Sequence, residues 1–183
     1  MGTKINELVS KTRKLKIGDP MDPEVHVGAL ISAEHMEKVL HCINEGLESG
    51  AKLIYGGNRY VADDAHIKDG YFVEPTIFLS EDEESNLVKN EIFGPVMTII
   101  GFDNEDEVLK KANDTEFGLA GGVFTNDLQR GHRVVNKLQC GVCWINNYNI
   151  TPVQVPFGGS KQSGFGRENG MAAIEHDTPL KTG

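Results

Sequence analysis

The most informative stretch of the chain reads Glu91-Ile92-Phe93-Gly94-Pro95-Val96. Gly94 and Pro95 predict a turn, and the apolar run over 96–100 that follows predicts a buried strand. In an extended approach to that strand, side chains two positions apart share a face, so Glu91 and Phe93 would point the same way. A carboxylate accepts hydrogen bonds from a diol, and a flat ring lies against another ring. The pair is therefore a candidate for holding a ribose and its base. The alternative, in which Glu91 caps a turn and Phe93 fills a core, stays open.

Patterns on both sides of this stretch predict an α/β fold. Before it, apolar spacing predicts helices over 4–15 and 32–50 and strands over 52–55 and 71–79. Pro75 suggests that the second strand lies at an edge or contains a bulge. The polar stretch over 58–70 predicts a surface loop. After it, capped helices alternate with apolar runs: a helix capped by Asp103 or Asn104, a strand over 119–125, a helix from Asn126 or Asp127 to Leu138, and a strand over 141–145. This alternation predicts a mainly parallel twisted sheet with helices on both faces.

Composition excludes several classes of partner. The 183 residues suit one domain or one lobe of a larger protein. With 27 acidic against 18 basic residues the net charge is -9, which argues against a nucleic-acid partner. No apolar run approaches the roughly 20 residues that span a bilayer, and no signal peptide is recognisable, so no membrane association is expected. Three cysteines are an odd number for a disulfide framework, which predicts a reducing, cytoplasmic location.

Two clusters after residue 139 carry candidate chemistry. Cys140-Gly141-Val142-Cys143 is a single CxxC, too few ligands for a zinc site, so no metal is expected. A thiol redox site stays open, but the apolar run after Cys143 favours buried strand cysteines. The second cluster, Asn146-Asn147-Tyr148-Asn149, follows the carboxyl end of a predicted strand, where open α/β sheets place their sites.

Four motifs resemble, in order and spacing, the signatures of the catalytic domain of the NAD(P)-dependent aldehyde dehydrogenases. They lie over 91–95, 112–120, 144–146 and 156–168, so the resemblance covers essentially the whole chain. Ser160 departs from the tyrosine usual at its position. Asn146 to Asn149 and the Pro156-Phe157 segment look most like the branch that includes the 4-trimethylaminobutyraldehyde and betaine aldehyde dehydrogenases. The resemblance implies that Glu91 holds the nicotinamide ribose and that Phe93 lies beside the nicotinamide ring.

The same resemblance implies that parts of the enzyme are missing. The family's nucleophilic cysteine lies in a Gly-Gln-x-Cys segment upstream of the first helix predicted here, and its general base, oxyanion asparagine and dinucleotide-binding domain are further upstream. We therefore expect residues 1–183 to be a partial catalytic domain that also lacks the last, oligomerising strand. Cys42, Cys140 and Cys143 do not match the nucleophile's motif, so no catalytic residue is assigned.

In the intact enzyme, the resemblance implies attack of a cysteine thiolate on an aldehyde, hydride transfer to NAD(P)+ and release of the carboxylic acid by water. NAD is the expected cofactor. NADP stays open, because the dinucleotide-binding domain, which is absent here, determines the choice between the two. Tyr148 and Phe157 would line the aldehyde tunnel, where their rings suit a trimethylammonio group, although simple loop packing stays open. The intact enzyme is expected to be a homo-oligomer and the isolated chain inactive. The alternative is a non-catalytic truncated chain that acts only in folding or assembly with partner chains.

Overall fold

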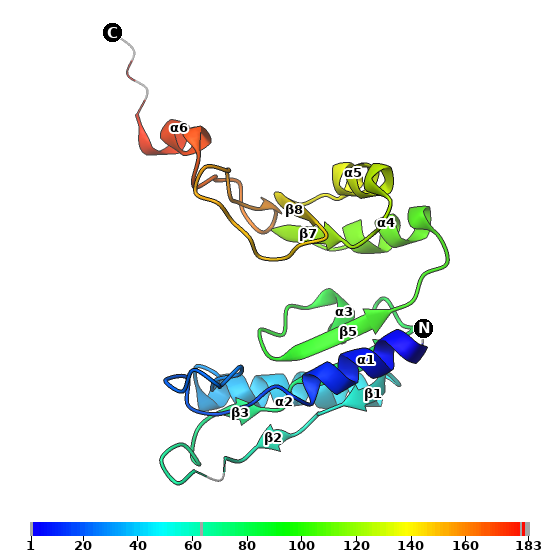
Figure 1. Ribbon diagram of the computed structural model, residues 1–183, viewed down its shortest axis with the longest axis vertical. Helices are drawn as coiled ribbons and strands as arrows, with labels where there is room; N and C mark the ends of the chain where they lie inside the picture. The colour runs from blue at the N-terminus through cyan, green and yellow to red at the C-terminus, as the bar shows by residue number, and fades with distance from the viewer. Residues whose placement is uncertain (1, 63, 180, 182–183) are drawn as a thin grey trace. The chain divides into compact units, whose positions relative to one another are not determined.

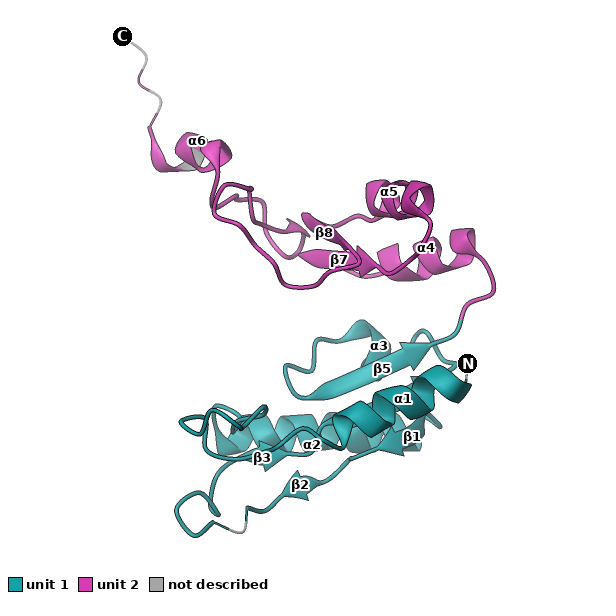
Figure 2. Ribbon diagram, viewed as in Figure 1, with its two compact units in different colours: residues 1–101 teal, residues 102–183 magenta. Residues whose placement is uncertain are grey.

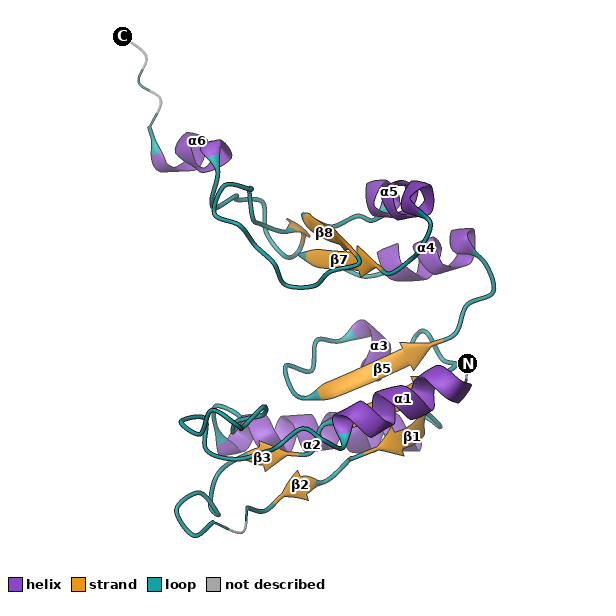
Figure 3. Ribbon diagram, in the orientation of Figure 1, coloured by secondary structure: helices purple, strands orange, loops and turns teal. Residues whose placement is uncertain are grey.

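The computed structural model describes residues 2–62, 64–179 and 181. The chain divides into two compact units, residues 1–101 and 102–183 (Figure 2). Helices and strands alternate in both units (Figures 1 and 3), which confirms the predicted α/β class. Each unit is built around a pair of parallel strands, β4 (Thr76–Ser80) with β5 (Val96–Ile100) in the first, and β7 (Ala120–Val123) with β8 (Val142–Ile145) in the second.

The first unit holds a three-stranded sheet of order β1-β4-β5. β1 (Lys52–Tyr55) runs antiparallel to β4, and β4 runs parallel to β5 in a register that pairs Thr76 with Val96. The unit's other elements are α1 (Gly2–Thr12), α2 (Ala33–Glu48), α3 (Asn86–Lys89) and an antiparallel pair formed by β2 (Arg59–Tyr60) and β3 (Phe72–Val73).

The second unit places two helices and a short antiparallel pair around β7 and β8. The helices are α4 (Glu105–Asn113) and α5 (Leu128–Lys137), and the pair is β6 (Phe117–Gly118) with β9 (Ser160–Lys161). A 3₁₀ turn, η1 (Met171–Ala173), and α6 (Ile174–Asp177) follow.

Pro75 divides the strand predicted over 71–79 into two strands that belong to different sheets. Proline has no N–H for a ladder bond, and the chain changes partners at this residue. Of the edge or bulge predicted at Pro75, the edge is wrong for β4, which lies between β1 and β5, whereas the β1–β4 pairing does contain a register shift, on β1 between Leu53 and Tyr55. The surface loop predicted over 58–70 is wrong in part, because it contains β2 and the buried Ala62. β5 is a strand as predicted but only half-buried, since β4 is its one neighbour among the strands that the structure describes.

The helix caps form where the sequence placed them. The Ser32 side chain accepts a hydrogen bond from the backbone N–H of His35 at the start of α2. Asn104 and Asp127 do the same for α4 and α5 and so prove to be the caps, in place of Asp103 and Asn126. Such caps satisfy backbone donors that a helix start leaves free, and each stabilises by about 1 kcal/mol.

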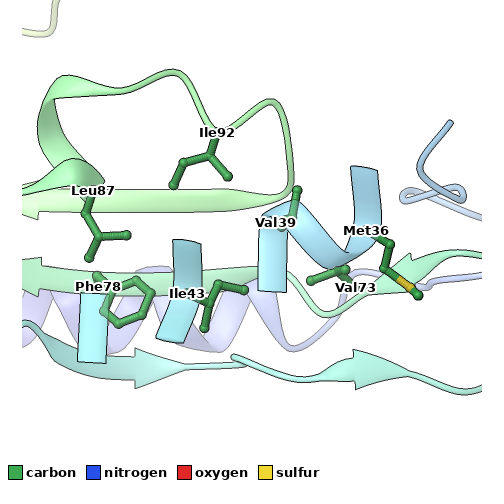
Figure 4. Close-up of a cluster of buried hydrophobic side chains, with 7 residues drawn as sticks. All are labelled: Met36, Val39, Ile43, Val73, Phe78, Leu87 and Ile92. Atoms are coloured by element: carbon green, nitrogen blue, oxygen red, sulfur yellow. The ribbon is translucent and has the colours of Figure 1, made fainter. Parts of the chain in front are cut away.

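The core of the first unit is a band of apolar side chains beneath α2 (Figure 4). Its members come from α2, β3, β4, α3 and the loop after α3: Met36, Val39, Ile43, Val73, Phe78, Leu87 and Ile92. A Cβ at Gly46 would collide with the side chain of Leu87, so this glycine lets α2 and α3 pack closely. The core thereby holds α3 and the loop that leads to β5. No helix among the described residues has the length and apolar character to cross a membrane.

Candidate cofactor and substrate site

Glu91 and Phe93 lie in the loop between α3 and β5. Ile92 between them is 9% exposed and belongs to the core, whereas Glu91 and Phe93 are exposed, Phe93 at 73%. The core role considered for Phe93 is therefore wrong. The extended approach predicted for this stretch is also wrong at Phe93, whose φ of 56° is left-handed. Glu91 and Phe93 nevertheless both face solvent, on either side of the buried Ile92, so the carboxylate and the ring are free to contact a ligand.

His35 holds the backbone of this loop. Its Nε2 donates to the carbonyl oxygen of Phe93 over 2.6 Å. Gly94, the next residue, packs against α2 so closely that a Cβ there would lie 2.8 Å from a methyl group of Val39. The carbonyl of Pro95 accepts from the N–H of Thr76 at 2.7 Å, where β4 and β5 begin to pair. Sequence reasoning missed His35, because its contact spans 58 positions and no local pattern marks it.

A pocket of about 280 Å³ lies beside the exposed ring. Its walls come from α3, the loop and β5, and include Leu87, Ile92, Phe93, Val96 and Thr98. Ligand sites combine apolar walls with placed polar groups, and here apolar side chains line the pocket together with exposed polar atoms, while the Glu91 carboxylate is exposed two residues from Phe93. Phe93 lines this pocket and Glu91 does not, but both side chains are exposed and can be reached by a ligand at this loop.

A second, separate candidate site follows β8 in the other unit. Asn146 has a φ of 54°, and its side chain accepts from the N–H of Thr125 at 2.8 Å and donates to the Thr125 carbonyl at 2.9 Å. This amide ties the chain after β8 to the chain after β7, at the carboxyl ends of two parallel strands. Asn146 thus fixes the start of the loop, and residues 146–150 are all exposed to solvent.

Tyr148 in this loop is 75% exposed. Its ring lies 5.8 Å from the indole of Trp144, and the indole Nε1 donates to the carbonyl of Ile150 at 2.8 Å. Phe157 is half-buried, and its backbone pairs with Glu168 through two hydrogen bonds of 2.8 Å. Tyr148 therefore has an exposed aromatic face, whereas the ring of Phe157 is partly packed within the protein.

The motifs over 112–120 and 156–168 interlock in the second unit. Lys161 Nζ donates to the carbonyls of Asn113 at 2.7 Å and Thr115 at 3.0 Å, and the N–H of Gly118 donates to Ser163 Oγ at 3.0 Å. Asn113 also binds the end of α5, accepting from the N–H of Gln139 and donating to the Lys137 carbonyl. These hydrogen bonds tie the two motifs to each other and to the end of α5, a role that their separate positions in the sequence do not reveal.

Cys140 and Cys143 are less buried than the sequence predicted. Cys42 in α2, Cys140 before β8 and Cys143 within β8 are all half-buried free thiols. Burial raises the pKa of the Cys42 thiol. Over residues 2–62, 64–179 and 181, no group of three or more histidine, cysteine or acidic side chains is arranged to hold a metal ion.

Comparison with known proteins gives a single family. The family model described as "Aldehyde dehydrogenase family" matches residues 3–182. The 4-trimethylaminobutyraldehyde dehydrogenase of Homo sapiens is 53% identical over 176 residues, which cover 96% of this chain and 36% of that protein. The betaine aldehyde dehydrogenase of Brucella anthropi is 51% identical over 178 residues, covering 97% of this chain and 36% of that protein.

Solved structures agree with the sequence matches. An aldehyde dehydrogenase from Bacillus cereus in complex with NAD+ superposes with a TM-score of 0.90 at 41% identity, covering 98% of this chain and 35% of that one. The chain thus spans about a third of the length of the relatives it matches.

Proposed function

Because the chain belongs to the aldehyde dehydrogenase family, we propose that it is part of an enzyme that oxidises an aldehyde to the carboxylic acid with NAD+. In this proposal residues 1–183 are a partial catalytic domain. The nucleophile segment, the dinucleotide-binding domain and the oligomerisation strand lie outside them. The chain contributes one wall of the cofactor site and one side of the substrate tunnel. NAD is preferred over NADP because the matched Bacillus cereus structure is an NAD+ complex.

The observation that carries the proposal is the loop between α3 and β5. Glu91 offers a carboxylate to ribose hydroxyls, and Phe93 offers a ring face beside a pocket, while His35 and the buried Ile92 fix the backbone between them. Such prior positioning matters because the entropy of orienting a reactant is lost before the reaction begins. When bound here, the nicotinamide supplies the hydride acceptor. The protein's contribution is to hold that ring and its ribose in one place.

The substrate proposed for the intact enzyme is a trimethylammonio aldehyde. A quaternary ammonium has no hydrogen to donate, so a site recognises it through charge and aromatic faces. The exposed ring of Tyr148 and the half-buried ring of Phe157 lie on or beside the loop after β8 that the proposal assigns to the tunnel. The relatives named for 4-trimethylaminobutyraldehyde and betaine aldehyde support this substrate class.

We also propose that the intact enzyme is a cytoplasmic homo-oligomer. The three free cysteines are consistent with a reducing compartment.

Replacement of Glu91 by Gln in the intact enzyme tests the cofactor role. The amide keeps the size of the side chain but removes the negative charge and one of its two acceptor oxygens. We expect single-turnover hydride transfer, followed as NADH absorbance, to slow by up to about a hundredfold, because a small misplacement of the reacting group has that effect. Aldehyde affinity should change little.

Glu81→Gln, in the acidic loop before α3, is the matched control and should leave the rate unchanged. An unaltered single-turnover rate in Glu91→Gln would remove the role proposed for the carboxylate.

A further inference from the structure

The two thiols of the CxxC segment are in contact. Cys140 Sγ and Cys143 Sγ lie 3.1 Å apart, Cys140 in the bend before β8 and Cys143 within β8. A disulfide has an S–S distance of about 2.05 Å, so the sulfurs need to approach by only about 1 Å. The pair is held by its surroundings, since Cys140 Sγ donates to the Val142 carbonyl and Cys143 Sγ to the Val135 carbonyl at the C-terminal part of α5.

Space for the pair depends on small residues around it. Gly121 of β7 faces Cys140, and a Cβ at Gly121 would lie 3.0 Å from Cys140 Sγ. Gly141, between the two cysteines, lies so close to the backbone of Gly158 that a Cβ would collide with it. The bend that brings the thiols together is therefore fixed by packing against two other segments.

We propose that Cys140 and Cys143 form a redox-active dithiol, which a peroxide oxidises to an intramolecular disulfide. This site is separate from the cofactor and substrate residues described above and does not depend on the proposed aldehyde chemistry. Among the described residues, no third thiol, imidazole or carboxylate joins the pair to complete a metal cluster, which favours redox chemistry over metal binding.

The two cysteines take different parts in the oxidation. Burial and the neighbouring Cys140 thiol raise the pKa of Cys143 to about 12, so Cys143 stays protonated at neutral pH. A protonated thiol is a poor nucleophile, so Cys143 is disfavoured for the first attack, which we assign to Cys140. Its sulfur binds one peroxide oxygen, the O–O bond breaks, and the leaving hydroxide takes a proton to become water, which leaves Cys140 as a sulfenic acid.

The second step closes the disulfide. The sulfur of Cys143 attacks the sulfur of the sulfenic acid, the S–O bond breaks, and the departing hydroxide leaves as water with the Cys143 proton. In total two thiols lose two electrons and one hydrogen peroxide is reduced to two waters. A thiol reductant reverses the change.

Mass spectrometry of the 183-residue chain tests the proposal. The chain is treated with hydrogen peroxide, its remaining thiols are blocked with N-ethylmaleimide, and it is digested with trypsin. Both cysteines fall in the peptide between Lys137 and Lys161, whereas Cys42 falls in another. We expect this peptide to lose two hydrogen masses and to carry no N-ethylmaleimide, while Cys42 remains alkylated, so that the thiol count falls from the 3 cysteines of the sequence to one.

Serine variants separate the two steps and provide a control. Cys143→Ser should stop at a sulfenic acid that dimedone traps on Cys140, and Cys140→Ser should give no peptide lighter by two hydrogens. Cys42→Ser should behave as wild type, which shows that the assay does not depend on the third thiol. If wild-type and Cys42→Ser chains instead keep both thiols alkylated, form only disulfides between chains, or oxidise Cys140 to the sulfinic acid without the lighter peptide, the dithiol proposal is wrong.

Discussion

At the scale of single residues, the candidate site rests on a few unusual backbone positions. Phe93 and Asn146 both adopt left-handed conformations, and each accepts a hydrogen bond from a distant residue, Phe93 from the side chain of His35 and Asn146 from the N–H of Thr125. Strained positions of this kind persist only where the surrounding structure determines them, and they gather at functional sites. The residues exposed next to them are the aromatic and acidic side chains to which the proposal assigns ligand contacts.

The ring of Tyr148 provides the residue-scale test of the substrate. Replacing Tyr148 by Leu keeps apolar bulk but removes the aromatic face, whose interaction with a cation is worth about 0.5–2 kcal/mol. In the intact enzyme the preference for a trimethylammonio aldehyde over a neutral aldehyde of equal length should fall by several-fold to about thirtyfold, measured as the ratio of the two kcat/KM values. Phe157→Leu should act in the same direction.

Tyr148→Phe is the matched control, because it keeps the ring and removes only the hydroxyl, and it should preserve the preference. Equal losses on the charged and the neutral aldehyde in Tyr148→Leu would mean that the ring only shapes the loop.

At the scale of elements, local chemistry was predictable and distant pairing was not. The caps at Ser32, Asn104 and Asp127 follow from side chains next to the helices that they begin. By contrast, nothing near residues 117 or 161 marks β6 and β9 as partners, because a strand's partner depends on chain far away in sequence.

The same limit applies to the candidate site. Glu91 and Phe93 were found from their motif, and their exposure agrees with a contact role. The hydrogen bond from His35 to Phe93 and those between Asn146 and Thr125 could not be predicted from the sequence, since each joins segments more than 20 positions apart. The change of sheet at Pro75 was missed because an apolar run looks the same whether one strand or two use it.

The packing of α2 against α3 gives an element-scale prediction. Alanine at Gly46 gains about 1 kcal/mol of helix propensity, but its methyl group collides with Leu87, and overpacking costs about 1–3 kcal/mol. We therefore expect Gly46→Ala to lower the free energy of unfolding of the chain in urea. Leu87→Ala alone should lower it by about 2–5 kcal/mol, because a buried leucine is lost.

The double variant isolates the contact. With Leu87 already replaced by alanine, the new methyl group at position 46 has room, and Gly46→Ala should become neutral or stabilising. An equal cost of Gly46→Ala in both backgrounds would show that the glycine is needed for some reason other than Leu87.

At the scale of the whole molecule, the chain exposes more surface than its mass explains. The accessible surface is 12675 Å² for 20.1 kDa. Even two independent globules of half that mass would expose only about 10,500 Å² together. Large apolar side chains contribute to this surface in both units, among them Met21, Ile31, Phe124, Val153 and Phe165. Such surface is typical of a segment that has contacts in a larger protein.

We therefore expect the isolated chain to associate with itself. Sedimentation velocity over a wide range of concentrations should show oligomers that grow with concentration, and a dye that fluoresces on apolar surfaces should bind. The intact enzyme at the same protein mass should bind less dye per chain. A monomer that leaves the dye silent at every concentration would instead indicate a self-sufficient domain.

The central claim is that this chain supplies the nicotinamide wall of an aldehyde dehydrogenase but not its nucleophile. The most direct measurement compares NADH formation by the isolated chain and by the intact enzyme that contains it, each given 4-trimethylaminobutyraldehyde and NAD+. The intact enzyme should form NADH and the isolated chain none. NADH formed by the isolated chain, and abolished when serine replaces Cys42, Cys140 or Cys143, would contradict the claim, as would an intact enzyme that oxidises no aldehyde.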